Sequence, residues 1–439
     1  MAQQRDILIH GAETHNLRGL DLRIPRRSLT VVTGVSGSGK SSLAFDTLFR
    51  EGQRRFLETL PAFARRFSGS FARPAVRGID GLGPAVALGQ RATQNSPRST
   101  VGTLTEAWDL LRLLFARLGE APDPIRPSRG LFSFNHESGA CPRCQGLGVE
   151  DRLDLGLLVA DPRRSLREGA LRVSTPNGYL MYSQVTLEVL DQVLRAHGGS
   201  VDQPWQDLPE EVRQVVLHGS ERLKVPYGKH SLESRLKWTG ITARPRPEGF
   251  YRGLLPVMDE ILRGKRNDSI LRFVRSSPCP ACAGTRLRPE ALAVTWHGHR
   301  IVDLAALSVR ELRAVLAGIA PRPAEAAVLS PIRADLLARC DLLEELGLDY
   351  LALARPAPSL SSGELQRLRL AGLALGDLRG LLVVLDEPSA GLHPREVARL
   401  LDVLRRLRDQ GQTVVVVEHD ASLARAADWL VDLGPGPGS

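Results

Sequence analysis

The sequence predicts an α/β fold, a mainly parallel sheet covered by helices on both faces, with a further α+β domain inserted into it. An apolar, β-branched segment at 29–33 runs straight into a glycine-rich loop and then a helix. Toward the C-terminus, apolar segments at 381–385 and 413–417 alternate with a helical segment at 395–409. Strands that alternate with helices are typical of a parallel sheet buried on both faces. Residues 141–282 interrupt this pattern with long polar helical stretches, which predicts the inserted domain.

The remaining elements follow from the same patterns, taken in chain order. A short apolar run at 7–10 predicts a first strand, and the amphipathic run at 42–48 predicts a helix after the glycine-rich loop. Helical periodicity continues over 105–118, and the proline-rich segment 121–127 marks a break after it. A helix in which arginine and leucine alternate is expected at 365–375.

Composition places the chain among ordinary globular proteins. Of the 439 residues, 43% are hydrophobic and 24% charged, which excludes wholesale disorder, and the length predicts two or three domains. The longest apolar candidate, 368–385, is broken by Arg369, Asp377 and Arg379, so we expect no membrane span. The N-terminus lacks the apolar centre of a signal peptide. We therefore expect a soluble cytoplasmic protein.

The charge balance is strongly basic, with a formal net charge of +9 and a pI of about 9.7. A polyanionic partner is one explanation. Lysine is rare among the 58 basic residues, however, and the dominance of arginine is equally consistent with a coding bias. The scarcity of lysine makes each lysine position informative, since a chain that otherwise uses arginine has kept it there.

The glycine-rich loop fits G-x-x-x-x-G-K-[ST] in the context that this motif requires, after a strand and before a helix. Its backbone N–H groups would surround phosphate oxygens, and the helix N-terminus adds a favourable dipole. Lys40 would reach the β- and γ-phosphates, and the hydroxyl of Ser41 would ligate Mg²⁺. The alternative is a glycine-rich turn that matches by chance. The residues expected to bind nucleotide are Gly34, Val35, Ser36, Gly37, Ser38, Gly39, Lys40, Ser41 and Ser42.

Two later strands end in groups that suit the same chemistry. The apolar segment 381–385 is followed by Asp386, placed to hold Mg²⁺ through water, and by Glu387, which could polarise an attacking water. The strand 413–417 leads to His419, where a histidine could sense the γ-phosphate. Taken singly, each could equally be a solvated strand end.

Residues 360–367, Leu-Ser-Ser-Gly-Glu-Leu-Gln-Arg, lie between these elements. From the residues alone this is a helix start capped by Ser361 or Ser362. It resembles the signature motif of ATP-binding cassette (ABC) proteins, which implies that Ser361, Ser362 and Gly363 touch the γ-phosphate and that Gln90 is the Q-loop residue. A side chain at Ser362 replaces the usual glycine and would crowd the phosphate, which predicts a low rate.

Four of the five cysteines form two Cys-x-x-Cys pairs, Cys141 with Cys144 and Cys279 with Cys282. Two such turns can present four thiolates to Zn²⁺ in a tetrahedron. A redox pair and plain core cysteines are the alternatives, although a redox pair needs only one such turn. The 134 intervening residues are too many for a standard zinc finger, so the metal would tether the inserted domain. Cys340 stands alone and is expected to be a buried small hydrophobe.

At this point the chain resembles the UvrA family, the damage-recognition ATPases of the bacterial excinuclease. The segments that carry the resemblance are the two cysteine turns and residues 33–49, 51–55, 95–103, 131–135, 284–288 and 385–393. The resemblance implies an ABC-type core from both chain ends, with ATP, Mg²⁺ and Zn²⁺ as cofactors and no nuclease activity of its own. The expected parts are the ATP-binding core at 1–120 and 376–439, the signature region with its cysteine turns at 121–148 and 276–375, and the insertion at 149–275.

The departures from the family are informative. UvrA carries two ABC modules, whereas this chain has one P-loop and one signature and resembles the N-terminal module. The domain that docks UvrB in that module has no counterpart between 119 and 131, so UvrB binding is doubtful. An ABC site closes between the P-loop of one module and the signature of another, which predicts a head-to-tail homodimer, with a pair formed with another half-size chain as the alternative.

The inserted domain resembles the UvrA insertion near the DNA path, which implies double-stranded DNA, damaged or drug-modified, as the partner. Cations contact phosphates without reading sequence, and aromatic rings could probe distorted stacking. The alternative is that the basic residues of this domain form a solvated face that binds no partner. The candidate residues are Lys224, Tyr227, Lys229, Arg235, Lys237, Trp238, Arg244, Arg246, Tyr251, Arg252, Arg263, Lys265 and Arg266. Alternative functions are resistance to an intercalating antibiotic and, from another class, the nucleotide-binding subunit of an ABC transporter.

Overall fold

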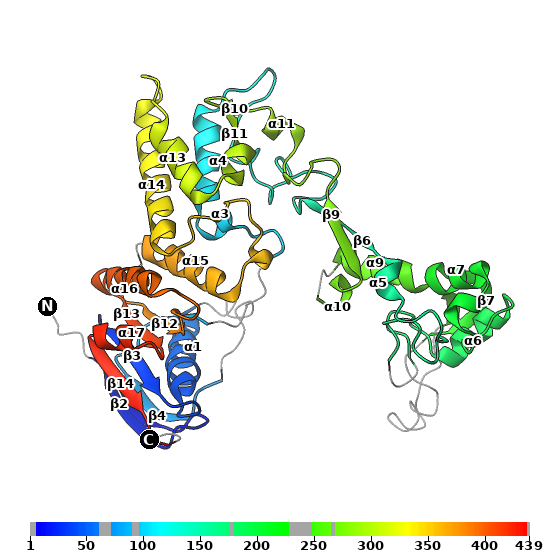
Figure 1. The fold of residues 1–439 in the computed structure, drawn as a ribbon, viewed down its shortest axis with the longest axis horizontal. Coiled ribbons are helices and arrows are strands. Elements are labelled where there is room, and N and C mark those ends of the chain that lie inside the picture. The colour runs from blue at the N-terminus through cyan, green and yellow to red at the C-terminus, as the bar shows by residue number, and fades with distance from the viewer. Residues whose placement is uncertain are drawn as a thin grey trace. The chain divides into compact units, whose positions relative to one another are not determined.

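The computed structural model describes residues 6–60, 72–89, 96–175, 179–227, 248–264, 268–376 and 378–436. The chain divides into two compact units. The first comprises Met1–Gly148 and Thr285–Ser439, and the second comprises Val149–Gly284. Helices and strands are present in both (Figure 1).

The centre of the first unit is a parallel sheet with the strand order β14-β3-β13-β12-β5. Val417 pairs both with Val32 and with Asp386, so the carboxyl ends of three neighbouring strands reach the same edge of the sheet. The strands are β3 (Leu29–Gly34), β5 (Ala85–Leu88), β12 (Leu382–Asp386), β13 (Thr413–Val417) and β14 (Trp429–Leu433). This edge is where the sequence predicts the nucleotide site.

Both faces of the sheet are covered, as the fold class predicts. Side chains alternate along each strand, so Val383 and Leu385 face one apolar cluster while Val384 faces another. Helices α15 (Ser362–Leu375) and α16 (Pro394–Asp409) belong to the first cluster. The helix after the glycine-rich loop covers the other face together with a three-stranded antiparallel sheet. That sheet consists of β1 (Ile7–Ala12), β2 (Leu20–Ile24) and β4 (Val76–Asp80).

The helix after the loop is wound in two ways. It begins with a π-helical segment, η1 (Ser42–Phe49), and continues as α1 (Arg50–Thr59). Thr47 lies inside the π-helical segment and donates from its hydroxyl to the carbonyl of Ser42, five residues earlier. Wider turns of this kind are frequently found at functional sites.

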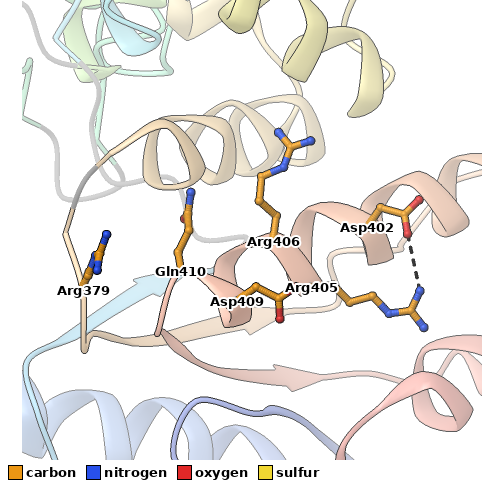
Figure 2. A pocket seen from close by; sticks show the side chains of 6 residues that line it. All are labelled: Arg379, Asp402, Arg405, Arg406, Asp409 and Gln410. Carbon is orange, nitrogen blue, oxygen red and sulfur yellow. Dashed lines mark ion pairs between the residues drawn. The ribbon is translucent and has the colours of Figure 1, made fainter.

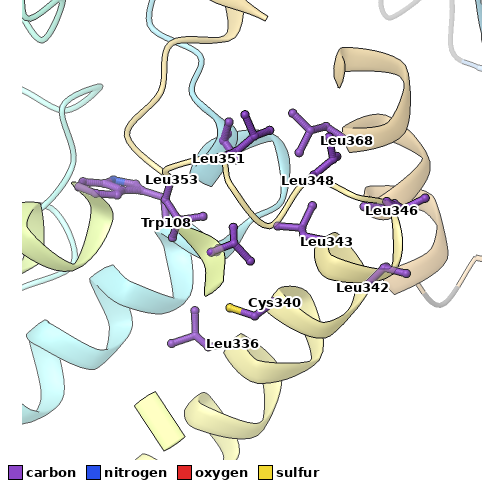
Figure 3. Packing of buried hydrophobic residues seen from close by; sticks show 14 of the residues in the cluster. Trp108, Leu336, Cys340, Leu342, Leu343, Leu346, Leu348, Leu351, Leu353 and Leu368 are labelled. Carbon is purple, nitrogen blue, oxygen red and sulfur yellow. The ribbon is translucent and has the colours of Figure 1, made fainter. Parts of the chain in front are cut away.

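A leucine-rich core holds the helices of the signature region together (Figure 3). Cys340 lies inside this core, where burial raises the pKa of its thiol to about 12, so it behaves as the small hydrophobe that was expected. The elements of this region are α3 (Val101–Leu104), α4 (Ala107–Leu118), α11 (Pro289–Leu292), β10 (Thr295–Trp296), β11 (His299–Arg300), α12 (Ile301–Ala306), α13 (Val309–Gly318), α14 (Ala326–Glu345) and η4 (Ala357–Ser359). The short helix α17 (Ala421–Ala426) completes the first unit.

One expected helix is divided in the structure. The pattern predicts a continuous helix over 105–118, but α3 and α4 are separate because Glu106 adopts a left-handed backbone with φ of 59°. The hydroxyl of Thr105 turns back to the carbonyl of Val101 at 2.9 Å and ends the first helix. A threonine hydroxyl that bonds the carbonyl four residues earlier slightly destabilises and often bends a helix, and periodicity does not reveal this.

The second unit has a core of its own, with Val212, Tyr251 and Met258 among its buried side chains. Two antiparallel strand pairs flank its helices, β6 with β9 and β7 with β8. Its elements are β6 (Val149–Leu153), α5 (Leu155–Leu158), α6 (Leu187–Arg195), η2 (Trp205–Asp207), α7 (Glu210–His218), β7 (Ser220–Pro226), β8 (Glu248–Tyr251), α9 (Leu254–Gly264), α10 (Asp268–Leu271) and β9 (Val274–Pro278).

Candidate functional site

The loop that follows β3 has a backbone that favours glycine at three positions. Gly34, Gly37 and Gly39 have φ values of 137°, 80° and 104°. At Gly34 a Cβ atom would lie 2.1 Å from the carbonyl oxygen of Leu433, so the loop also passes too close to β14 for any side chain. The amide of Asn16 donates to the carbonyl of Gly37 at 2.9 Å and supports the tip of the loop.

Lys40 lies at the base of this loop and is buried. Its Nζ donates to the carbonyl oxygens of Gly34 at 2.8 Å and Val35 at 2.9 Å. The hydroxyl of Ser38 is also buried and has no hydrogen-bond partner in the described part of the chain. Phosphate oxygens would be stronger acceptors for the ammonium group than carbonyls are, and would give Ser38 a partner. The loop therefore fits a phosphate group.

Ser41 and Ser42 follow Lys40 at the start of η1. Ser41 is exposed, and its side chain makes no capping hydrogen bond, so its hydroxyl remains available at the sheet edge. Ser42 is buried and is the first residue of η1.

The ends of β12 and β13 bring the predicted acidic and imidazole groups together. Asp386 is the last residue of β12, and Glu387 follows it with a left-handed φ of 43°. Its backbone N–H donates to the carbonyl of Val417 at 2.9 Å, which fixes this turn against β13. The imidazole Nε2 of His419 lies 3.7 Å from Glu387 Oε1, and the two side chains are 55% and 43% exposed. Both groups can therefore be reached from solvent. Gln90, the expected Q-loop residue, lies outside the described residues.

The signature turn, Ser361–Glu364, is a helix start closed by a capping box. Glu364 accepts the backbone N–H of Ser361 at 2.7 Å, and Ser361 Oγ accepts the N–H of Glu364 at 3.2 Å. The hydroxyl of Tyr350 donates to Glu364 at 2.6 Å, and Arg355 donates at 3.2 Å. Ser362 is exposed beside these groups, and a Cβ at Gly363 would meet no atom within 4 Å. The turn therefore presents its outer face to solvent.

These contacts set the charge of Glu364. Burial alone would raise the pKa of its carboxyl, but hydrogen bonds from Tyr350 and Ser361 and the positive charge of Arg355 outweigh burial and hold the pKa below its usual 4.5. Burial and the hydrogen bond to Glu364 raise the pKa of Tyr350 to about 12. The turn is thus built around a carboxylate and a neutral phenol at ordinary pH.

Sequence reasoning missed the residue that joins the signature helix to the strand ends. Gln366 is buried on α15, and its amide nitrogen donates to the carbonyl of Leu88 at 2.8 Å and to that of Asp386 at 2.9 Å. One side chain therefore links the signature helix to the ends of β5 and β12. The signal in the sequence was only a glutamine amid the apolar positions of that helix.

One hollow on the described surface lies away from the predicted nucleotide site. It has a volume of about 500 Å³ and is lined by polar side chains of α16 and by the segment before β12 (Figure 2). Arg405 pairs with Asp402 at 3.5 Å, and Arg406 pairs with Glu345 at 2.9 Å. Because these arginines already have acidic partners, the hollow offers little net charge to a ligand.

The cysteine turns bring four sulfur atoms together. The side chains of Cys141, Cys144, Cys279 and Cys282 are buried, and their Sγ atoms lie within 4.8 Å of one another. Thiolates around a tetrahedral zinc are separated by about 3.8 Å, given a Zn–S bond of about 2.3 Å. The N–H of Gly148 donates to Cys144 Sγ at 3.2 Å, a contact that suits a thiolate. The four cysteines form a cluster that fits zinc.

The basic and aromatic residues expected to meet DNA are only partly described. Lys224 is exposed on β7, with its Nζ 5.7 Å from the ring centre of Phe250, and Arg252 pairs with Glu260 at 2.5 Å. Tyr251 is buried and donates to the carbonyl of Val216 at 3.0 Å, so it belongs to the core and is not a surface contact. Phe250, which is 40% exposed, was missed.

Tyr227 is also held within the second unit, since its hydroxyl donates to the carbonyl of Phe250. The other members of the expected set lie outside the described side chains. These are Lys229, Arg235, Lys237, Trp238, Arg244, Arg246, Arg263, Lys265 and Arg266.

Two family models match parts of the chain. One, described as the UvrA DNA-binding domain, matches residues 154–243. The other, described as an AAA domain and putative AbiEii toxin of a type IV toxin–antitoxin system, matches residues 349–423. The first range lies in the second unit, and the second contains the signature turn and the strand ends of the first unit.

Curated relatives align along nearly the whole chain. The UvrABC system protein A of Thermus thermophilus is 33% identical over 583 residues, covering 98% of this chain and 60% of that protein. That of Mycobacterium tuberculosis is 33% identical over 584 residues, covering 98% and 59%. The chain thus spans about 60% of the length of these relatives. Because each alignment is longer than this chain, the relatives carry internal residues without a counterpart here.

A solved structure agrees with these alignments. The crystal structure of UvrA2 from Deinococcus radiodurans is 37% identical, with a TM-score of 0.79, and covers 100% of this chain and 55% of that one. Among the described residues, the helices are all too short or too polar to cross a lipid bilayer.

Proposed function

We propose that this chain, which belongs to the UvrA family, hydrolyses ATP and binds damaged or drug-modified duplex DNA in nucleotide excision repair or a related process. The observation that carries the proposal is a phosphate-fitting loop at one sheet edge with Glu387 and His419, in a chain whose second unit is matched by the UvrA DNA-binding domain. Its relatives are named as components of the UvrABC system.

In this proposal the residues at the sheet edge have separate roles in binding the phosphates, holding Mg²⁺ and activating water. Lys40 binds the β- and γ-phosphates, and the backbone around Gly37 and Gly39 surrounds them. Ser41 and Asp386 hold Mg²⁺, which neutralises phosphate charge when bound. Glu387 orients the attacking water and accepts its proton, and His419 lies beside it.

We further propose that the signature turn completes this site in a second copy of the chain. The turn exposes Ser362 at the start of α15 and needs no ligand to satisfy its own polar groups. A two-fold, head-to-tail dimer would set each P-loop against the partner's signature turn and close two sites. Ser361, Ser362 and Gly363 would then meet the γ-phosphate. The short connection between 119 and 131 has no counterpart of the domain that docks UvrB, so UvrB binding by this chain is doubtful.

The cysteine cluster is proposed to hold a single zinc ion. Elemental analysis of the purified protein should find about one zinc per chain, and Cys279→Ser should remove it, because three thiolates bind zinc more weakly than four. Cys340→Ala is the matched control: it removes the cysteine outside the cluster and should leave the metal in place. Zinc that is absent from the parent, or unchanged in Cys279→Ser, would contradict this assignment.

The experiment that tests the function is filter binding to intact, ultraviolet-damaged and intercalator-loaded duplex, with and without ATP. Tighter binding to one modified duplex, dependent on nucleotide, is the expected result. Equal affinity for all three would contradict damage recognition. Preference for the intercalator-loaded duplex alone would favour the resistance function.

The same assay tests the DNA path. Affinity should fall steeply with salt, because phosphate neutralisation releases counterions. Lys224→Gln should reduce the slope of log K against log salt by about 1. Arg167→Gln removes an equal charge from the same unit, but Asp202 already neutralises it at 2.6 Å, so its effect should be smaller. Equal effects would place the DNA elsewhere.

A further inference from the structure

Glu418 is a buried carboxylate between the two strand ends of the nucleotide site. It is only 2% exposed and directly follows β13. Its backbone N–H donates to the carbonyl of Val32 at 3.1 Å, so its main chain continues the pairing with β3. Charged side chains are seldom buried so completely without compensating bonds.

Both oxygens of this carboxylate accept backbone hydrogen bonds. Oε1 accepts the N–H of Ser389 at 2.9 Å. Oε2 accepts the N–H of His419 at 2.8 Å and that of Asp420 at 3.2 Å. Ser389 stands two residues after Glu387, whereas His419 and Asp420 begin the loop after β13. One side chain thus binds the loop that carries Glu387 to the loop that carries His419.

This bridge joins the backbone close to both reacting groups, since Glu418 bonds the N–H of His419 and that of Ser389, two residues after Glu387. Glu387 and His419 approach to 3.7 Å, yet both side chains are about half exposed and cannot hold each other firmly in water. Their separation is therefore set by their backbones. The N–H of Glu387 donates to Val417 at 2.9 Å, which anchors one of these backbones, and Glu418 anchors the segments on either side. Charge-assisted bonds to buried N–H groups are short and well oriented.

We propose that Glu418 is a positioning residue for ATP hydrolysis, which holds Glu387 and His419 at their working separation by bridging the two loops. The inference rests on the proposed ATPase function. It assigns Glu418 no contact with nucleotide, so the substitution should lower the turnover rate and leave nucleotide binding nearly intact.

The test compares Glu418→Gln with Asp420→Asn in the full chain. An amide has only one acceptor oxygen. In either orientation of the Gln side chain, the backbone N–H groups of one of the two loops therefore lose their acceptor. Asp420 is the matched control, because its carboxylate accepts N–H groups of Ser422 and Leu423 at the start of α17 and does not reach Ser389. Steady-state ATPase gives kcat and KM, and titration with a non-hydrolysable ATP analogue gives the binding-competent fraction.

Glu418→Gln should lower kcat per binding-competent chain on the order of 10- to 100-fold, since small misplacements of reacting groups have effects of this size. Its affinity for the analogue should stay within about threefold of the parent, and Asp420→Asn should keep kcat within about twofold. Glu418→Asp keeps two acceptor oxygens on a shorter stem. It should fall between the parent and Glu418→Gln in kcat, and it carries the test if Glu418→Gln does not fold.

The inference is overturned if Glu418→Gln keeps the parent kcat, if Asp420→Asn loses as much, or if kcat and analogue affinity fall together. The proposed function has its own control. A Lys40→Ala variant that hydrolyses ATP like the parent would place ATP hydrolysis outside this loop and defeat the proposed site itself. A Lys40→Ala variant that is impaired beside an unimpaired Glu418→Gln would defeat only the role of Glu418.

Discussion

The glycine-rich loop and the signature turn are both helix starts, but they differ in how far their own residues satisfy their polar groups with hydrogen bonds. In the loop, the hydroxyl of Ser38 is buried without a partner in the described chain, and Lys40 rests on two carbonyl oxygens of its own loop. In the turn, Ser361 and Glu364 satisfy each other reciprocally. The loop is a site that a ligand completes, whereas the turn is complete by itself and offers a fixed surface. The loop is suited to binding a ligand, whereas the turn is suited to presenting a fixed surface. The same substitution should therefore change protein stability differently in the two places.

The largest effect is expected at the strand end beside the loop. Glu387→Gln should lower kcat by roughly 10²- to 10⁴-fold, the usual contribution of a general base, because only the group that handles water is lost. Nucleotide affinity should stay within about threefold. Asp402→Asn, which removes a surface carboxylate of α16, serves as the control. Parent-like hydrolysis by Glu387→Gln would remove the catalytic role from this edge.

The next effect concerns ligand binding by the loop. Lys40→Ala should weaken ATP binding by about 10- to 100-fold, the equivalent of a charged hydrogen bond worth roughly 1.5–3 kcal/mol. Arg50→Ala removes a cation from the same helix, where it pairs with Asp46 at 3.0 Å, and should leave affinity unchanged. Fluorescent-nucleotide titration measures both. An unaltered ATP affinity in Lys40→Ala would mean that Lys40 only donates to carbonyls of its own loop and does not bind the nucleotide.

A smaller effect is expected in the turn, and it depends on pH. Glu364→Gln should speed amide hydrogen exchange in the first turn of α15 by about tenfold or more at neutral pH, since it weakens bonds to a charged group. The folded-state pKa of Glu364 lies below 4.5, so the stability it adds is fully present above pH 4.5 and is lost as the pH falls through the folded value. The difference between the parent and the variant should shrink accordingly in acid.

Glu311 provides the control for that experiment. It forms the same capping box with Ser308 at the start of α13, but in an exposed setting. Glu311→Gln should leave exchange in α15 unchanged. A gap between parent and Glu364→Gln that widens in acid would contradict the stated direction of the pKa.

The smallest effect is also the sharpest comparison, because it uses one substitution in both places. Ser38→Ala removes an unsatisfied buried hydroxyl and should raise the free energy of unfolding by about 1 kcal/mol. Ser361→Ala removes a cap and should lower it by about 1 kcal/mol. Urea unfolding with an unchanged m-value measures both. Changes of the same sign in the free energy of unfolding would contradict the distinction between a loop with an unsatisfied hydroxyl and a turn that satisfies its own polar groups.

Local features of the sequence were sufficient for much of the fold and for placing the glycine-rich loop and the strand ends at one edge of the sheet. The strand 413–417 was predicted at its observed limits, and the strand before Asp386 was displaced by one residue. The cap predicted at Ser361 or Ser362 is confirmed at Ser361, so the signature helix begins at Ser362, three residues before the range 365–375 that the alternation of arginine and leucine marked. Motifs read in this way depend on residues close in sequence.

The long-range bridges could not be predicted from those motifs. Gln366 reaches a carbonyl 278 residues away, and Glu418 reaches a backbone N–H 29 residues away. Neither contact produces a periodic pattern or a motif of fixed spacing in the sequence, because each depends on which strands become neighbours in the sheet. Tyr251 illustrates the converse: its place among basic residues indicated a surface, whereas strand alternation turns it into the core.

The central claim is that the loop of one chain works with the turn of another, and complementation tests it most directly. At an ATP concentration near the parent KM, Lys40→Ala and Ser361→Arg chains should each show little activity alone, since every site in either homodimer lacks one half. Their heterodimer joins one intact loop to one intact turn, so an equal mixture should recover up to about a quarter of the parent ATPase rate. A mixture no more active than the two variants measured separately would contradict the account.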